Sequence, residues 1–179
     1  MRYIPLFGKK IIWAVQYMKL TVMHKWFVMV VGLRLGVPLW RLLKHDLSKF
    51  RWCEIWGYGR QFFGDELAGI VFAKAWLHHQ NTNDHHWEYW IPRSAHTRVG
   101  YYDNAPMEMP EHVMLEMVAD WFAAGRAYQG KWPDPRRWAW YNDRFHKMHL
   151  HMKTRRDIEE LVRNMKRDPK WWLSKLNSE

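Results

Sequence analysis

The chain has 179 residues, 48% of them hydrophobic, and Lys and Arg outnumber Asp and Glu by 28 to 18. This length predicts one domain rather than two independent ones, and the abundance of Trp (14) and Met (11) with few β-branched runs favours packed helices. The positive charge predicts attraction to nucleotides, nucleic acid or acidic membranes, while the single cysteine, Cys53, excludes an internal disulfide and suits a reducing compartment such as the cytoplasm.

The first predicted helix covers about Lys9 to Val31. Its apolar residues recur every three or four positions and are expected to face inward: Ile12, Val15, Val22, Trp26 and Met29. The apolar run from Trp26 to Leu33 is much shorter than the roughly 20 residues of a membrane-spanning helix. The N-terminus also lacks the pattern of a secretory signal, so we expect neither a membrane span nor a leader.

Three more helices are predicted before residue 80. A short one follows Pro38, a second covers about Trp52 to Phe63, and a third runs from about Asp65, as an N-cap, to His78 or His79. Residues 80–110 contain Asn, Asp, Pro and Gly without a sustained period. They predict a long irregular loop, which in a compact domain is usually functional.

The clearest helical pattern is PEHVMLEMVADWFAAG, which Pro110 opens and Gly125 is expected to cap. Its apolar stripe consists of Val113, Met114, Met117, Val118, Trp121 and Phe122. Helices are also expected over about Pro135 to Met152 and Thr154 to Arg167, with Thr154 in a capping position. The sequence therefore predicts an all-α domain of six to seven helices over residues 1–179, with a core at 23–130 and a basic helical extension at 131–179.

The number of histidines and one carboxylate on an apolar helix face indicate a metal site. The chain has 11 histidines, and Asp120 lies within the apolar stripe, where an unpaired charge is costly. Imidazoles and carboxylates suit Mn, Fe, Co, Ni or Zn, with Mg possible, and the thiolates of a structural zinc site are missing. We therefore expect one or two divalent ions in an open, catalytic site.

The order of His24, the His45-Asp46 doublet and Asp120 resembles the HD-domain superfamily of helical, metal-dependent proteins. HDLSK is similar to the HD-x-G-K form of the doublet, with Ser48 in the place of glycine. HHQNTNDHHWEYW resembles the extra histidine pairs of the subgroups that hold two metals. Together with EMVADWFAAG, these motifs also resemble a phage and bacterial family of unknown function, over most of residues 23–130.

The resemblance implies a set of ligands. A first ion would be held by His24, His45, Asp46 and Asp120. Asp46 would bridge to a second ion held by one histidine of each pair, with His79 and His86 favoured over His78 and His85. In the alternative interpretations, the doublet is a hydrogen-bonded pair at a helix end, Asp120 pairs with a buried arginine, and His24 is a core histidine bonded to a carbonyl.

Asp46, Lys49 and Glu116 are the expected catalytic residues. Lys49 lies just past the doublet, where it can contact a phosphate oxygen. Glu116 lies one helical turn before Asp120 and is expected to orient a ligand or shuttle a proton, unless it is solvated.

Substrate binding is expected from the loop. Arg93 and Arg98 would hold phosphates, and Trp87 would stack on a base, unless it and its aromatic neighbours belong to the core. The leading hypothesis is a phosphohydrolase that attacks a nucleotide or related phosphate ester with a metal-activated water. The alternatives are an HD-like di-iron oxygenase and a non-catalytic, metal-stabilised module that binds nucleic acid or a host protein.

Overall fold

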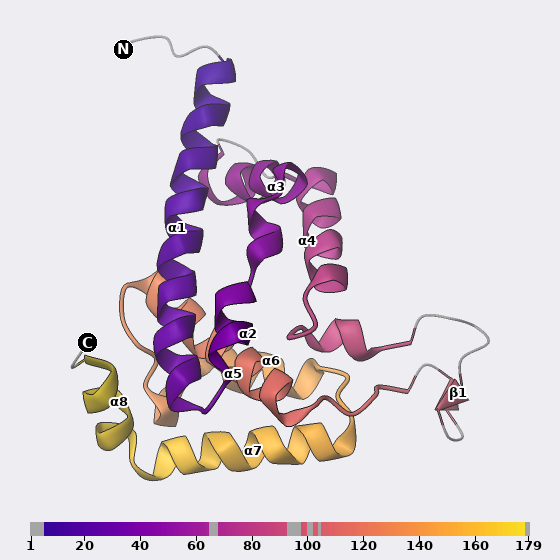
Figure 1. The fold of residues 1–179 in the computed structure, drawn as a ribbon, viewed down its shortest axis with the longest axis vertical. Helices are drawn as coiled ribbons and strands as arrows, with labels where there is room; N and C mark the ends of the chain where they lie inside the picture. The colour runs from indigo at the N-terminus through magenta and orange to yellow at the C-terminus, as the bar shows by residue number, and fades with distance from the viewer. Residues whose placement is uncertain (1–5, 65–67, 93–97, 100–101, 104, 178–179) are drawn as a thin grey trace.

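The computed structural model describes residues 6–64, 68–92, 98–99, 102–103 and 105–177. Eight α-helices and four short 3-10 helices account for most of this part of the chain (Figure 1). The only strands described are β1 (Arg98–Val99) and β2 (Tyr102–Asp103), a two-residue antiparallel pair. The predicted all-α class is confirmed.

Helix α1 (Leu6–Arg34) is the longest helix, and its orientation differs from the prediction. Val15, Val22 and Trp26, expected to face inward, are 39%, 58% and 58% exposed. Tyr17 and His24 are buried instead. Both faces of α1 carry apolar residues, so the periodicity alone predicted the wrong buried face. In the structure, the buried face is the one that carries the polar groups of the site.

The segment after α1 contains α2 (Leu39–Lys44), the 3-10 helix η1 (Leu47–Phe50) and α3 (Trp52–Phe63), followed by α4 (Ile70–Thr82). Helix α3 has the predicted bounds. The predicted N-cap Asp65 lies outside the described residues. A small cluster joins α1, α3 and α4 and consists of Ala14, Tyr17, Ile55, Tyr58 and Ala75.

The predicted loop over residues 80–110 is more ordered than expected. Helix α4 continues to Thr82, and the 3-10 helix η2 (Trp87–Trp90) follows. The indole Nε1 of Trp90 donates to the backbone oxygen of Asp84 at 2.6 Å, and the ring packs against the main core. Tertiary packing of aromatic side chains thus orders a segment that has no period of its own.

Helix α5 (Glu111–Gln129) passes through the middle of the main core. Its predicted apolar stripe is buried throughout. The predicted cap at Gly125 is wrong, because the helix continues to Gln129 and ends at Gly130, which has a left-handed φ of 73°. Position 125 requires glycine for a different reason, because a Cβ there would overlap the ring of Pro133.

The C-terminal part also differs in its boundaries. The single helix predicted from Pro135 is broken into η3 (Pro135–Arg137), α6 (Ala139–Arg144) and η4 (Phe145–Lys147). Helix α7 (Met152–Arg167) is capped by His151 rather than by Thr154. Thr154 is buried, and its hydroxyl oxygen accepts a hydrogen bond from the backbone N of Met109 at 3.1 Å. Helix α8 (Pro169–Asn177) was not predicted.

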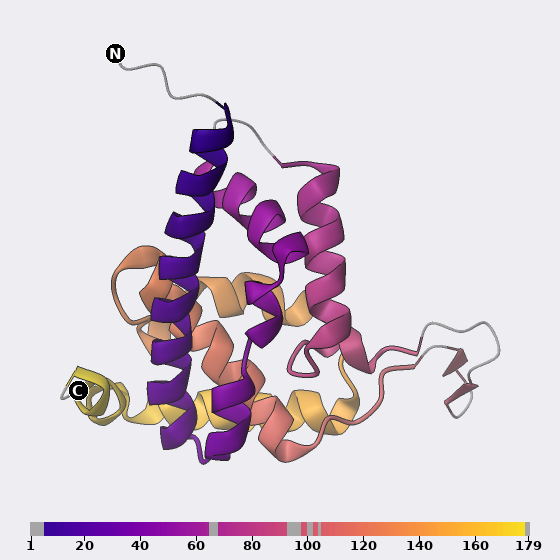
Figure 2. The same ribbon diagram turned by 45° about the horizontal axis from the view of Figure 1, so that its top comes forward.

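Helix α1 belongs to both cores, and Figures 1 and 2 show α2 beside it. Helix α5 packs against α1 in the main core, which α7 and α8 complete, while α3 packs against α1 in the smaller cluster and α4 packs against α3. Among the described residues, no helix combines the length and the apolar character needed to cross a membrane.

Candidate metal centre

The His-Asp doublet lies where α2 ends and η1 begins. Asp46 has φ 56° and ψ 22°, and it is the only non-glycine residue with positive φ in the described part of the chain. This left-handed conformation breaks the helix, so that the adjacent side chains of His45 and Asp46 are both buried in the interior. Such backbone strain, on the order of 1 kcal/mol, is typical of functional sites.

The four residues predicted to hold a first ion meet in the structure. Ligand atoms of His24, His45, Asp46 and Asp120 all lie within 4.8 Å of one another. His24 Nε2 lies 2.8 Å from Asp120 Oδ1 and 3.7 Å from Asp46 Oδ2. His45 Nε2 lies 3.3 Å from the same Asp46 oxygen. Helices α1 and α5 and the α2–η1 junction each contribute to this group.

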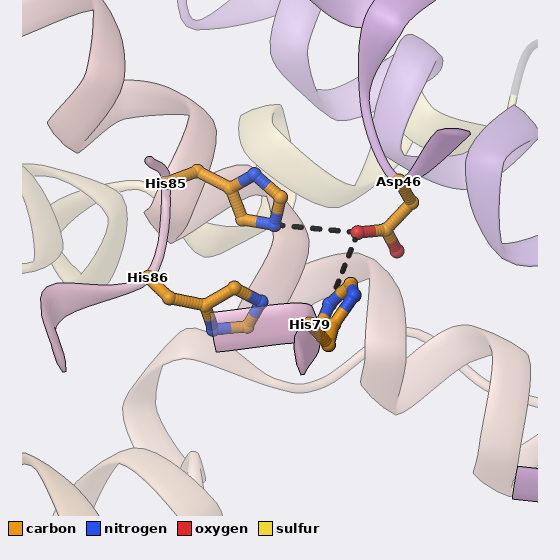
Figure 3. A group of neighbouring side chains, drawn as sticks. All are labelled: Asp46, His79, His85 and His86. Atoms are coloured by element: carbon orange, nitrogen blue, oxygen red, sulfur yellow. Dashed lines mark ion pairs between the residues drawn. The ribbon is translucent and has the colours of Figure 1, made fainter. Parts of the chain in front are cut away.

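A second group shares Asp46 and adds His79, His85 and His86 (Figure 3). His79 Nε2 and His85 Nε2 lie 3.3 Å and 3.4 Å from Asp46 Oδ1. The two oxygens of Asp46 therefore face different groups, Oδ2 the first and Oδ1 the second. This is the geometry of a bridging carboxylate.

The second group corrects the choice of histidines. His79 belongs to it as predicted, and His78 instead places Nδ1 2.6 Å from Glu54 Oε1. Both members of the second pair belong to the group, so the prediction that took His86 alone missed His85. A doubled histidine signals proximity to a site but does not tell which ring enters it.

Five buried atoms in these groups make no hydrogen bond. They are the Nε2 atoms of His45, His79, His85 and His86, and Oδ1 of Asp46. His24 Nε2 and Asp46 Oδ2 are instead paired with Asp120 Oδ1 and Lys49 Nζ. Buried polar atoms almost always have partners, because an unpaired one costs about 1–3 kcal/mol. Lone pairs of imidazole and carboxylate that converge in this way fit the coordination shell of a cation, so the residues present fit a divalent metal.

Carboxylates behind the histidines fix the direction of the rings. Glu116 Oε1 lies 2.9 Å from His45 Nδ1 and 3.4 Å from His85 Nδ1, while Glu54 Oε2 lies 3.0 Å from His79 Nδ1. An Nδ1–H that donates to a carboxylate leaves Nε2 free to bind a metal. The expectation that Glu116 orients a ligand agrees with this geometry, and the solvated alternative is wrong because the side chain is buried.

Two residues that support the ligands, Glu54 and Arg41, were missed from the sequence. Glu54 is fully buried, and the only signal for it was a carboxylate in the aromatic helix just after the doublet. Arg41 donates from Nε to Glu116 Oε2 at 2.6 Å and from Nη2 to Asp84 Oδ1 at 2.6 Å. The buried arginine therefore pairs with Glu116, and Asp120 pairs with His24 instead, contrary to the arginine alternative for Asp120.

The pKa values of the histidines follow from burial and from the neighbouring carboxylates. Burial lowers the pKa of His24, His79 and His86, so these rings are neutral at pH 7. Burial also lowers the pKa of His45, but Asp46 and Glu116 outweigh it and raise that pKa to about 9. The negative charges of Asp46 and Glu116 thus stabilise a positive charge at the position of His45.

The two aspartates are ionised. Burial raises their pKa, but His45 and Lys49 beside Asp46 and His24 beside Asp120 outweigh it and lower both pKa values. Lys49 is buried, with Nζ 2.5 Å from Asp46 Oδ2. Burial lowers the pKa of Lys49, but Asp46 outweighs it and holds that pKa well above its usual range.

Of the three loop residues predicted to bind substrate, the structure describes the side chain of Trp87. Trp87 packs against the main core, as in the core alternative, with its ring 6.0 Å from that of His149. Arg93 and the side chain of Arg98 lie outside the described residues. A cavity of about 300 Å³ next to the centre is lined by His45, His85, Glu116 and other residues that include Trp40, Lys44 and Tyr89.

One family model matches the chain over residues 14–164, a span that contains every residue of both groups, and its description is a family of unknown function (DUF5662). No curated protein and no solved structure matches the chain.

Proposed function

Because the chain belongs to this family of unknown function, its activity has to be inferred from the site, and we propose that it is a metal-dependent phosphohydrolase. The proposed substrate is a nucleotide or a related phosphate ester. We further propose that the chain is a distant member of the HD-domain superfamily, which the order of His24, His45-Asp46 and Asp120 supports.

The observation that carries the proposal is the convergence of buried imidazole and carboxylate atoms on the two sides of Asp46. His24, His45, Asp46 and Asp120 would hold one ion, and Asp46, His79, His85 and His86 the other. Divalent ions held there would lower the pKa of water and neutralise charge that develops on a phosphoryl group.

The protein's own residues position and charge the site. Glu54 and Glu116 hold the imidazoles in place through Nδ1. Lys49 stays protonated and places a fixed positive charge beside Asp46, where it would stabilise a phosphate oxygen. Lys44 and Trp40 line the adjacent cavity and would contact the phosphate and the base of a nucleotide.

The test is phosphate release by the purified chain from a panel of nucleotides and simple phosphate esters, with Mn, Co, Ni, Zn or Mg. We expect turnover of at least one substrate, and its loss in Asp46→Ala. His146→Ala, which removes an exposed histidine outside both groups, is the matched control and should retain full activity. A panel that stays silent with every metal would contradict the proposal.

One observation favours a second candidate, a di-iron oxygenase. The second group has three imidazoles and a single carboxylate, a nitrogen-rich set that suits iron better than Mg. The chain would then be isolated with about two irons, and its absorption spectrum would change when an anaerobic preparation meets oxygen. An unchanged spectrum would favour the hydrolase. So would a chain that gains phosphate-releasing activity when Mn, Co, Ni, Zn or Mg replaces its iron.

A further inference from the structure

An apolar stripe runs along the outer face of α1, away from the metal centre. Its members follow one another at helical spacing and are 39–58% exposed: Ile11, Val15, Val22, Trp26 and Leu33. Contiguous exposed apolar surface of this kind is uncommon in soluble monomers and marks an interaction site.

Neighbouring segments widen the stripe into a face. Phe50 of η1 is 38% exposed and lines one apolar groove together with Val15 and Val22. Leu43 of α2 is 59% exposed and lies next to α1, because Lys25 Nζ donates to its backbone oxygen at 3.4 Å. Figures 1 and 2 show α1 and α2 side by side in both views. We call these exposed residues of α1, α2 and η1 the α1–α2 face.

The charged residues of the helices that form this face have one sign. The first 45 residues of the chain contain eight Lys and Arg and no Asp or Glu. The first carboxylate is Asp46, which is buried in the metal centre. Lys10, Lys19 and Lys44 are exposed on the helices that form the face. The α1–α2 face is therefore apolar and cationic, without a carboxylate from its own helices.

This combination of charge and apolarity selects the partner. A second copy seated on the same face would bring like charges together without a counter-charge. Nucleic acid would neutralise the lysines but would leave Val22 and Trp26 unburied. An anionic lipid surface takes apolar side chains into its interfacial region and attracts each nearby lysine.

We propose that the α1–α2 face binds the surface of an anionic membrane, with α1 lying in the plane of the interface. The helix does not need to cross the bilayer for this.

Flotation with vesicles tests the proposal. The full chain is mixed at low salt with vesicles of phosphatidylcholine alone, or of phosphatidylcholine with about one third phosphatidylglycerol. We expect the chain to bind the anionic vesicles, and to bind the neutral vesicles at least about tenfold more weakly. Val22→Glu and Lys19→Glu should each reduce binding, whereas Met152→Glu should not, because Met152 is 85% exposed at the start of α7, outside the face.

Several results would overturn the proposal. They are failure to float with anionic vesicles, binding by Val22→Glu equal to that of the unmodified chain, and a dimer in sedimentation velocity that Val22→Glu dissociates. Circular dichroism and thermal melting of each variant exclude misfolding as the cause of lost binding. Because flotation requires neither metal nor substrate, its result is independent of the proposed hydrolase activity.

Discussion

At the scale of single residues, Asp46 determines the arrangement of the centre. Its left-handed backbone turns the chain at the end of α2, and its two oxygens face two different groups of histidines. Glu54 and Glu116 then hold the rings from behind. The directions of the His45, His79 and His85 imidazoles are thus set by carboxylates that lie behind them.

The support from Glu54 gives the first prediction. Glu54→Gln keeps the shape of the side chain but removes the charge that faces His79 Nδ1. We expect it to weaken metal binding about 10–100-fold, because such partners orient the ligand and increase its basicity. Calorimetric titration with Mn or Zn measures the affinity. Glu159→Gln, at an exposed position of α7, is the control, and equal affinities in the two variants would contradict the assignment.

The raised pKa of His45 gives a second prediction, for the chelator-treated protein. A group with a folded pKa of about 9 and an ordinary value of 6.5 stabilises the fold fully below pH 6.5 and loses this contribution as the pH rises toward 9. We expect the free energy of unfolding in urea to fall over this range by about 3 kcal/mol at most.

With metal bound, His45 has no proton to lose, so this fall should disappear. His45→Gln should also remove it from the chelator-treated protein. If the unmodified protein without metal keeps a constant free energy of unfolding between pH 6.5 and 9, the field assigned to Asp46 and Glu116 is wrong.

At the scale of elements, close helix packing decided what local signals left ambiguous. Helix α5 continues past Gly125, where Pro133 occupies the space that a Cβ would fill, and ends where Gly130 adopts a left-handed φ. A glycine near the end of a helical pattern is compatible with a cap and with a close contact. Only the position of Pro133 distinguishes the two.

Gly125→Ala tests this contact. Alanine favours the helix by about 1 kcal/mol, but its Cβ would overlap the Pro133 ring, which costs about 1–3 kcal/mol. We expect the net free energy of unfolding to decrease in urea titrations, and the double variant with Pro133→Ala to recover part of the loss. A Gly125→Ala protein as stable as the unmodified one would show that the contact is not limiting.

At the scale of the whole molecule, the candidate metal centre joins parts of the chain that pack in different cores. Its residues come from α1, the α2–η1 junction, α4, the segment before η2, and α5. Metal binding should therefore stabilise the fold as a unit. At a metal concentration about 100 times Kd, the added stability is about 2.7 kcal/mol.

Thermal melting with and without a chelator measures this effect. We expect a higher Tm with Mn or Zn and a lower one after chelation. Asp46→Ala, which removes the carboxylate shared by both groups, should melt at the same temperature in either condition. A Tm of the unmodified chain that does not respond to any divalent metal would exclude a resident ion.

The sequence by itself determined the all-α class, the inward stripe of α5 and the four residues that converge in the first group. These features are local or depend on residue type: a strong helical period, a carboxylate within an apolar stripe, and a doublet that resembles a known motif. The long segment after α4 and the C-terminal helices were predicted less well, because aromatic packing and not period orders them.

Tertiary structure decided which face of α1 is buried, which histidines enter the second group, and which carboxylates support them. The physical reason is that both faces of α1 are apolar and both members of each histidine pair are chemically equivalent. Only the positions of α3, α4 and α5 around Asp46 distinguish His79 from His78 and bring in His85. They also leave the opposite face of α1, apolar and cationic, exposed to solvent.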